Sequence, residues 1–401
     1  MSYGVSPELP SVRLDDYNHA QVVEYLSTRH AANKDVGFGV CQYAHGLGTP
    51  PVAGAYYGGV YSPTQNRIYM IPFSQADMAT WHYIDCSTGM IVPYEHGVTA
   101  LNLAYRGGVY SPTQNRIYLV PYAQGNQPTW HYIDCSTGAI VPYIHGVSAS
   151  SLAYMGGVYS PTQNRIYFVP YSQADTATWH YIDCNTGSVS PYTHGATAVG
   201  QAYGGGVYSP TQNRIYLVPY AQADVATWHY IDCSTGAVVG YSHGLSPLPI
   251  DGAYIGGAYS PTQNRIYLAP DSATFGSIWH YIDCFTGEVV PYAHGLALAT
   301  NSYIYATYSP TSNRIYLCPQ VRGNLPTWHY IDCATGRVVS YEHGCSALIY
   351  PYRGAVYSPT NNRLYFIPYD QAPQASWHYI QEYSAADVSP TLMSSTLFNK
   401  L

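Results

Sequence analysis

Charged side chains are scarce in this sequence of 401 residues, because Asp, Glu, Lys and Arg together make up only 9% of it. A typical soluble domain contains about 25% of these residues. Lysine is almost missing, with Lys34 and Lys400 alone, the formal net charge is −7, and no cluster of basic residues occurs. Binding to nucleic acid or to an anionic membrane requires such a basic surface. The composition therefore predicts no nucleic-acid partner.

Long apolar segments are also missing. No stretch approaches the roughly 20 apolar residues of a membrane-spanning helix, so we expect no membrane insertion. The first residues, MSYGVSPELPSVRLDD, lack the basic start and apolar core of a secretory signal. We therefore expect the chain to be made in a reducing cytoplasm. Six of the nine cysteines recur at one repeated position and are expected to be small buried thiols: Cys86, Cys135, Cys184, Cys233, Cys284 and Cys333.

Motifs for catalysis and metal binding are not found either. The sequence has no Ser-His-Asp setting, no glycine-rich phosphate loop, no CxxC and no HExxH. Acids such as Asp251, Asp271 and Glu288 are scattered, whereas catalysis needs convergent groups in one cleft. We therefore predict no enzymatic activity, no cofactor and no metal. A hydrolase or lyase that uses a central funnel is the least favoured alternative.

What the sequence does contain is seven copies of one unit. The clearest copy, residues 205–244, reads GGVYSPTQNRIYLVPYAQADVATWHYIDCSTGAVVGYSHG. The Tyr-Ser-Pro starts are spaced by 49, 49, 49, 51, 49 and 49 residues. A fixed period of this length indicates an array of identical small units, each unable to bury its apolar face alone. The starts are Tyr61, Tyr110, Tyr159, Tyr208, Tyr259, Tyr308 and Tyr357.

Each copy contains four short strand-like runs. In the fourth copy we predict strands over 205–208, 214–220, 227–232 and 237–241, separated by turns rich in Pro, Asn, Ser, Thr and Gly. Four strands per unit of about 50 residues are typical of a β-propeller blade. The predicted fold is therefore all-β, a seven-bladed propeller with four antiparallel strands per blade.

The ends of the repeats predict how the ring closes. Seven His-Gly ends occur, but the first, at His45, precedes the first Tyr-Ser-Pro start, and the last copy has none. An N-terminal strand should therefore complete the last blade and remove an exposed sheet edge. We assign residues 36–383 to the propeller, residues 1–35 to an extension with a helix near 14–32, and residues 384–401 to a tail. The helix either packs on the ring or docks a partner.

The order YSPTQNRIY followed by WHYIDCSTG and a Val-Val strand resembles propeller repeats of the WD-repeat and YVTN type. The resemblance covers residues 36–383 and implies the propeller fold, which serves many unrelated functions. The near-identity of the copies and their tyrosine-rich, weakly charged character also resemble proteins of phage or large-virus particles. That second resemblance implies a structural component of a virion.

The most conspicuous repeated residues are interpreted as structural. Each blade repeats Trp-His-Tyr and, but for the last, His-Gly; buried polar groups of this kind need internal hydrogen bonds. A repeated Arg begins the second strand and a repeated Asp ends the third, so an Arg–Asp bridge is expected within each blade. Gln381 replaces the Asp in the last copy. The arginines are Arg67, Arg116, Arg165, Arg214, Arg265, Arg314 and Arg363, and the aspartates are Asp85, Asp134, Asp183, Asp232, Asp283 and Asp332.

Function is expected where the copies differ. Differences concentrate in the connection between strands two and three and in the connection to the next blade, and both should lie on one face of the disc. Either these loops have drifted, or they bind something asymmetric. We therefore expect a non-enzymatic interaction protein that binds protein partners in a larger symmetric assembly. The alternative is a glycan-binding lectin with one site per blade. The candidate binding residues are Phe275, Ile278, Arg322, Leu325, Tyr350 and Arg353.

Overall fold

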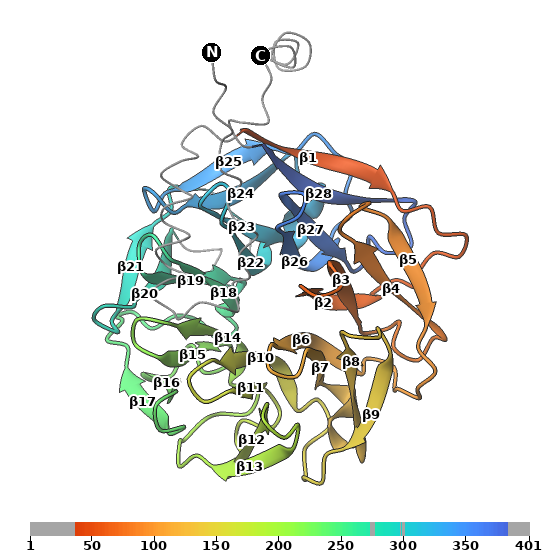
Figure 1. Cartoon of the computed structure of the whole chain (residues 1–401). Coiled ribbons are helices and arrows are strands. Elements are labelled where there is room, and N and C mark those ends of the chain that lie inside the picture. Colours follow the sequence, from red (N-terminus) through yellow and green to blue (C-terminus); the bar gives the residue numbers. More distant parts are fainter. Residues whose placement is uncertain (1–36, 273–276, 297, 299–300, 384–401) are drawn as a thin grey trace, which may run out of the picture.

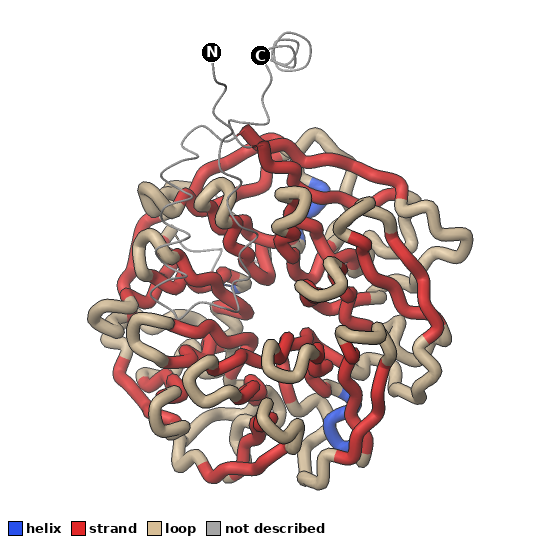
Figure 2. Tube along the Cα trace, viewed as in Figure 1, coloured by secondary structure: helices blue, strands red, loops and turns tan. Residues whose placement is uncertain are grey.

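The computed structural model describes residues 37–272, 277–296, 298 and 301–383. The predicted helix near 14–32 and the tail 384–401 lie outside the described residues. The described chain forms seven four-stranded antiparallel sheets arranged around a central axis (Figure 1). In six of the sheets the strands follow one another in sequence order from the axis to the rim, and in the seventh the outermost strand is the first strand of the described chain. Loops join the strands at both ends (Figure 2). The predicted seven-bladed propeller is confirmed.

The blades are numbered in chain order. Blade 1 contains β2 (Tyr56–Ser62), β3 (Arg67–Pro72), β4 (Thr80–Asp85) and β5 (Ile91–Glu95). Blade 2 contains β6 (Tyr105–Ser111), β7 (Arg116–Pro121), β8 (Thr129–Asp134) and β9 (Ile140–Ile144). Blade 3 contains β10 (Tyr154–Ser160), β11 (Arg165–Pro170), β12 (Thr178–Asp183) and β13 (Val189–Thr193). Blade 4 contains β14 (Tyr203–Ser209), β15 (Arg214–Pro219), β16 (Thr227–Asp232) and β17 (Val238–Ser242).

The remaining blades repeat this arrangement. Blade 5 contains β18 (Tyr254–Ser260), β19 (Arg265–Pro270), β20 (Ile278–Asp283) and β21 (Val289–Ala293). Blade 6 contains β22 (Tyr303–Ser309), β23 (Arg314–Pro319), β24 (Thr327–Asp332) and β25 (Val338–Glu342). Blade 7 contains β26 (Tyr352–Ser358), β27 (Arg363–Pro368), β28 (Ser376–Tyr383) and, as its outer strand, β1 (Gly37–Ala44). Two 3₁₀ turns, η2 (Ala123–Asn126) and η4 (Val321–Asn324), interrupt the loops of blades 2 and 6.

The ring closes between the two ends of the propeller sequence. Strand β1 pairs antiparallel with β28 over eight residues, from Gly37 opposite Tyr383 to Ala44 opposite Ser376. The pair places His45 where the other blades place their His-Gly histidine, and His45 Nε2 lies 2.8 Å from the Gln374 carbonyl. The predicted closure by an N-terminal strand is confirmed, and it leaves blade 7 with the same four strands as the others.

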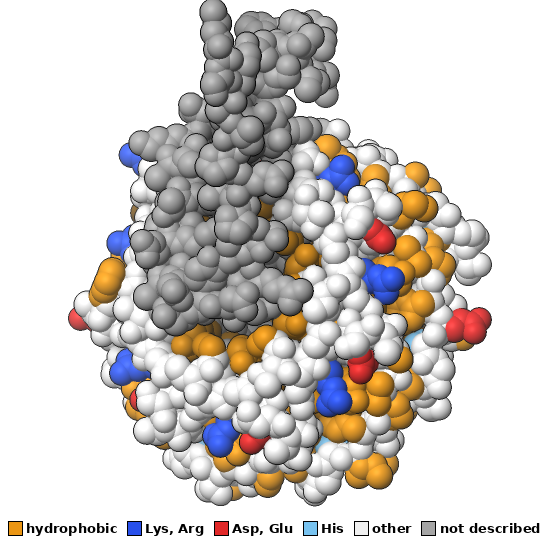
Figure 3. Space-filling model, viewed as in Figure 1, with side chains coloured by type: hydrophobic (Ala, Val, Ile, Leu, Met, Phe, Trp, Pro, Cys, Tyr) orange, Lys and Arg blue, Asp and Glu red, His pale blue; other side chains and the backbone are white. Residues whose placement is uncertain are grey.

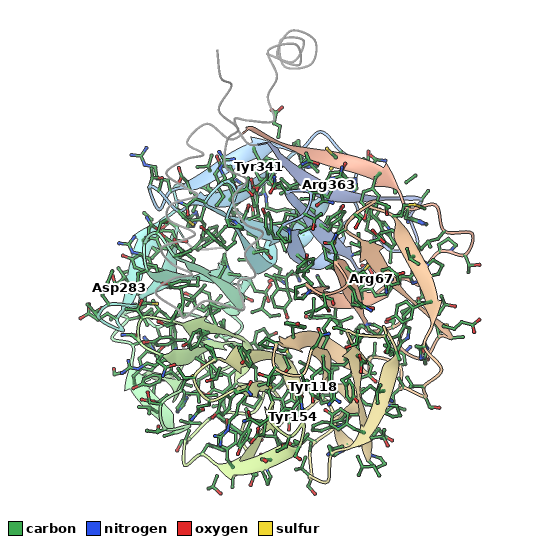
Figure 4. The ribbon with its side chains drawn as sticks, in the orientation of Figure 1. Arg67, Tyr118, Tyr154, Asp283, Tyr341 and Arg363 are labelled. Carbon is green, nitrogen blue, oxygen red and sulfur yellow. The ribbon has the colours of Figure 1, made fainter. Side chains whose placement is uncertain are left out.

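The core lies between neighbouring blades. Second strands such as β15 are buried along almost their whole length, whereas β17 at the rim alternates, because only one of its faces contacts protein. The seven repeated tryptophans are fully buried. Between blades 2 and 3, Tyr118, Trp130, Tyr154 and Phe168 belong to one apolar cluster, and Tyr118 and Tyr154 can be followed in Figure 4. Burial against the next blade stabilises each sheet, which is why the repeat needs its neighbours.

Tight turns occupy the positions that the repeat predicts. The Asn of each Ser-Pro-Thr-Gln-Asn turn adopts a left-handed conformation, as Asn213 does with φ of 53°. Asn tolerates this region better than most residues because its short side chain can hydrogen-bond locally. In β2 the pairing with β3 shifts register between Tyr56 and Gly59, and Gly58 takes φ of 81°. This bulge lies where the inner strand faces the axis.

The surface matches the composition. Figure 3 shows few charged side chains, scattered over the visible face, with hydrophobic side chains around the centre of the disc. The repeated cysteines are free and buried. Within the described ranges, no helix is long and apolar enough to cross a membrane.

Candidate binding surface and central pocket

The two faces of the disc carry different connections. Because each blade is an antiparallel meander, the loop between its second and third strands and the loop to the next blade leave from the same end. We call this side the loop face, and the side of the two tight turns the turn face. Backbone hydrogen bonds join neighbouring loops on the loop face; for example, the Leu103 amide donates to the Phe73 carbonyl at 3.0 Å. The variable segments therefore form one continuous surface.

The turn face is held by internal hydrogen bonds between blades. Thr162 of blade 3 donates to Asn213 Oδ1 at 2.9 Å and to the Cys233 carbonyl at 3.0 Å. Asn213 Oδ1 also accepts a 2.9 Å bond from Tyr208, and its amide donates to Ser234 at 3.1 Å. The repeated Ser-Pro-Thr-Gln-Asn turn therefore attaches one blade to the next. This accounts for its uniformity without any ligand.

The predicted Arg–Asp bridge does not form in blade 4, although Arg214 and Asp232 lie opposite each other in register. The Arg214 guanidinium lies 4.2 Å from the centre of the Tyr230 ring. Asp232 Oδ1 accepts the Ser234 amide at 2.8 Å and the Thr235 amide at 3.2 Å. The turn thus takes up the carboxylate, and a cation–π contact takes up the guanidinium.

Stacking and hydrogen bonds lock the outer strand to the third strand. The His243 ring stacks on Trp228 with 4.4 Å between centroids. His243 Nδ1 accepts the Leu245 amide at 3.2 Å, so its Nε2–H donates to the Val225 carbonyl at 3.0 Å. Trp228 itself donates to the Ala223 carbonyl at 3.4 Å. These contacts assign the His-Gly and Trp-His-Tyr repeats to the interior of the blade, as predicted.

The second histidine series lies deeper. His229 Nδ1 shares a 2.7 Å hydrogen bond with the Tyr203 hydroxyl, and both side chains are buried. Burial lowers the pKa of His229 to about 4, and the nearby His194 lowers it further. Within the described part of the chain, no three His, Cys, Asp or Glu side chains come together in a way that could hold a metal ion.

Exposed apolar side chains concentrate on the loop face. Of thirteen large hydrophobic side chains exposed in the described residues, ten lie in its loops or at their edge, two on the turn face and one, Ile144, at the rim. The two on the turn face are Met90 and Phe285. A grouping of this kind is typical of an interaction surface. The ten are Met78, Leu101, Val199, Leu248, Ile250, Ile278, Leu325, Leu348, Ile349 and Tyr350.

The candidate binding residues predicted from the sequence differ in their exposure to solvent. Ile278, Leu325 and Tyr350 are exposed on the loop face. Arg322 is only 9% exposed, and its Nη2 donates to the Thr327 carbonyl at 3.2 Å and to the Thr327 hydroxyl at 3.0 Å. It thereby replaces the repeated glutamine, which in blade 4 is Gln222. The expectation that Arg322 is an exposed anchor is wrong, because its guanidinium satisfies a buried backbone carbonyl.

The other two residues have different outcomes. Arg353 is 9% exposed and lies toward the axis instead of the outer surface, so it too is wrongly placed as an exposed anchor. Phe275 lies outside the described residues. Ile278 lines a groove of about 630 Å³ between the loop 244–250 and blade 5, together with Leu248 and Ile250. No observation tests whether any of the six binds a partner, and that role remains a prediction.

A second, smaller concavity lies on the axis. It measures about 210 Å³ and is lined by inner-strand glycines and by the side chains of Tyr57, Arg106, Met155, Tyr305 and Arg353. Around this pocket, the residue that follows the second strand is aromatic in blades 1–4 and 7, and these rings form an arc. Successive centroids in this arc are 6.1–6.2 Å apart. The arc consists of Tyr369, Phe73, Tyr122, Tyr171 and Tyr220.

Two polar residues interrupt this arc in blades 5 and 6. Asp271 and Gln320 take the positions of the aromatic residues and are both buried. With its amide oriented to satisfy both contacts, Gln320 donates to Asp271 Oδ1 at 3.2 Å and to the Tyr303 carbonyl at 3.1 Å. Burial raises the pKa of Asp271 to about 6, against the attraction of Arg353. The axial pocket is therefore asymmetric, although the blades that build it are nearly identical.

A comparison of the loops alone among the seven copies does not find most of the residues that line the axial pocket. The sequence does show these residues, because the seven copies differ from one another at the second residue of the inner strand. The differences lie inside a regular strand, where the surrounding repeat is nearly constant. A comparison of the copies residue by residue would have found them. The seven residues are Tyr57, Arg106, Met155, Gly204, Ile255, Ile304 and Arg353.

Comparisons with known proteins bear on the fold. No family model matches the chain, and no curated protein matches it. Among solved structures, U3-55K superposes with a TM-score of 0.56 at 5% identity, over 85% of this chain and 98% of that one. The β-propeller domain of Cps50 (Swd1) from Myceliophteria thermophila gives 0.55 at 8% identity, over 85% and 99%. An auxiliary nutrient binding protein from Bacteroides thetaiotaomicron gives 0.51 at 11%, over 87% and 77%. At such identities the likeness shows the propeller fold alone.

Proposed function

We propose that the chain is a non-enzymatic interaction scaffold that binds a protein partner through the loop face of blades 5–7. One observation carries the proposal: ten of the thirteen exposed large hydrophobic side chains of the described residues lie on the loop face. Exposed apolar side chains lower the solubility of a protein when no partner covers them, and the centres of protein interfaces are rich in apolar residues. The turn face, by contrast, satisfies its repeated polar groups internally.

The site that we assign to the partner lies around the apolar groove. Ile278 is 49% exposed and shares the groove with Leu248 and Ile250. Leu325 and the segment 348–350 extend the apolar surface into blades 6 and 7. Charged side chains are few there, so the contact should depend on apolar burial more than on salt.

Matched variants on the two faces test the proposal. Ile278→Asp and Leu325→Asp place a charge on the loop face, and Phe285→Asp and Met90→Asp place the same charge on the turn face. Phe285, Met90, Ile278 and Leu325 are 73%, 64%, 49% and 38% exposed, so all four changes should leave the fold intact. Tagged proteins are purified from the native host, and bound proteins are quantified for each variant against wild type. We expect loss of the same partner from the loop-face variants only, by about tenfold or more. Equal recovery from all four would refute the proposal.

The finer proposal places the protein in a virus particle or another symmetric assembly. It is supported by the weak charge and the tyrosine-rich composition alone. Native mass measurement of the protein from its source tests it directly. A free monomer with no associated protein would contradict it.

A glycan-binding lectin is the alternative. Seven equivalent sites would need a repeated aromatic platform, and each repeated tryptophan is buried. A titration that gives about seven glycans per chain would favour the lectin over the scaffold.

A further inference from the structure

We propose that the axial pocket binds a small organic carboxylate, held between Arg106 of blade 2 and Arg353 of blade 7. The pocket opens among the loop-face residues but is separate from the apolar groove, so the proposal does not depend on a protein partner. Both arginines line it, as do Tyr57 and Tyr305.

Arg106 is a partly buried cation among neutral neighbours. Its guanidinium lies 3.9 Å from the centre of the Tyr122 ring, 4.7 Å from that of Tyr57 and 5.3 Å from that of Phe73. Nη1 approaches the Met155 sulfur at 3.2 Å, and a thioether is a weak acceptor. Nε is buried without a hydrogen-bond partner. A desolvated charge held only by π faces and a thioether lacks the anion that would compensate it.

Arg353 lies on the other side of Tyr57, where the carboxylates of Asp271 and Asp370 attract its charge without forming a hydrogen bond to it. It lies 4.4 Å from the centre of the Tyr369 ring, and Nη1 donates to the Tyr352 carbonyl at 3.3 Å. Within the described residues, neither Arg106 nor Arg353 lies within salt-bridge distance of a carboxylate. Two guanidiniums on blades 7 and 2 therefore face one pocket with donors to spare. An anion between them would satisfy both.

The size and shape of the pocket indicate the class of anion. A volume of about 210 Å³ is smaller than the ~300–1,000 Å³ of sites for drug-sized ligands, so the ligand must be small. The planar fork of Arg matches the two oxygens of a carboxylate. Asp271, in the ring that surrounds the pocket, would repel a dianionic phosphate more than a carboxylate with one charge. A Cβ at Gly256 would lie 2.5 Å from the Tyr305 ring, so the glycine leaves room for this ring at the wall of the pocket.

The test is direct binding to the full chain. Isothermal titration at pH 7 measures benzoate and propionate as probes, with sodium phosphate as the third anion. Wild type is compared with Arg106→Gln, Arg353→Gln and Arg106→Lys. Arg337→Gln, an exposed arginine at the turn between β24 and β25, is the matched control. Circular dichroism and the melting temperature confirm that each variant is folded.

We expect at least one carboxylate probe to bind with a dissociation constant of about 1 mM or tighter. Each Gln variant should weaken binding about tenfold or more, the Lys variant less, and the control should bind as wild type does. Failure of folded wild type to bind either carboxylate, binding that the two Gln variants leave unchanged, or tighter binding of phosphate than of both carboxylates would each overturn the proposal. Ile278→Asp should not alter this binding, so its outcome is independent of the scaffold function.

Discussion

Acidification from pH 7 to pH 4 should unfold the propeller, because it forces protons onto histidines that the fold keeps neutral. The seven Trp-His-Tyr histidines are at most 3% exposed in six blades, and the seventh, His280, is partly buried. Burial lowers the pKa of each from 6.5 to about 4. In the unfolded chain the same side chains titrate near 6.5. Between these values the unfolded state binds more protons, so stability falls as the pH falls.

The size of the effect follows from the displacement of the pKa. A change from 6.5 to about 4 corresponds to at most about 3.4 kcal/mol per histidine, at 1.36 kcal/mol per pH unit. Water penetration and relaxation reduce this to about 1–2 kcal/mol, since an effective interior dielectric is well above that of dry protein. Seven equivalent histidines then amount to roughly 7–14 kcal/mol, which is comparable to the whole stability of a typical protein, about 5–15 kcal/mol. Stability is fully present above pH 6.5 and is lost progressively down to about pH 4.

Two measurements check this reasoning. The melting temperature, followed by tryptophan fluorescence from pH 7.5 to 4, should fall steeply below pH 6.5. NMR titration of the imidazoles in the folded protein should show that the Trp-His-Tyr series stays neutral at pH 5.5. His229→Gln should reduce the proton uptake on acid unfolding by about one. Imidazoles that titrate near 6.5 in the folded state, or a melting temperature that does not change over this range, would refute the argument.

Three further changes probe the blade contacts. Trp228→Ala should cost about 3–5 kcal/mol, measured by denaturant unfolding, because a fully buried indole and its stacked His243 lose their packing; a cost below 1 kcal/mol would contradict it. Asn213→Ala should cost about 2–4 kcal/mol, since the change removes one hydrogen bond from blade 3 and one within blade 4 at a residue with φ of 53°. Asn213→Gly should recover about 1 kcal/mol, and equal melting of the two variants would exclude the backbone contribution. Glu382, whose pKa burial raises, accepts Ser309 and, at 2.5 Å, Ser312. Because burial disfavours the ionised carboxylate, wild type should lose stability relative to Glu382→Gln as the pH rises above 4.5. A difference in melting temperature between the two proteins that is the same at pH 4 and at pH 7 would contradict this.

Glu382 lies at the boundary between blades 6 and 7, where two residues of the repeat are replaced together. At the other boundaries a repeated cysteine, such as Cys233, meets the serine of the preceding blade. Between blades 6 and 7 the glutamate replaces the cysteine, and Ser312 replaces the repeated glutamine. Both substitutions can be seen in the sequence, but their pairing cannot, because 70 residues separate them.

The sequence by itself determined the blade count, the four strands of each unit and the strand that closes the ring. These features depend on local turn chemistry and on a count of starts and ends, and both repeat seven times. In blade 4 the third predicted strand, 227–232, matches the observed one, and the other three differ by one or two residues at their ends, because strand ends depend on pairing with neighbours. The structural interpretation of the repeated Trp and His residues also followed from their position within strands.

Only the tertiary structure decided where the irregular residues lie. Arg322 and Arg353 look alike in sequence, as cations in variable segments, yet one satisfies a buried backbone carbonyl and the other faces the axis. Arg106 and Arg353 are 247 residues apart and reach one pocket because ring closure brings blades 7, 1 and 2 side by side. A periodic sequence encodes each blade through contacts within the unit and with its neighbours. The pocket on the axis, by contrast, exists only when all seven blades meet.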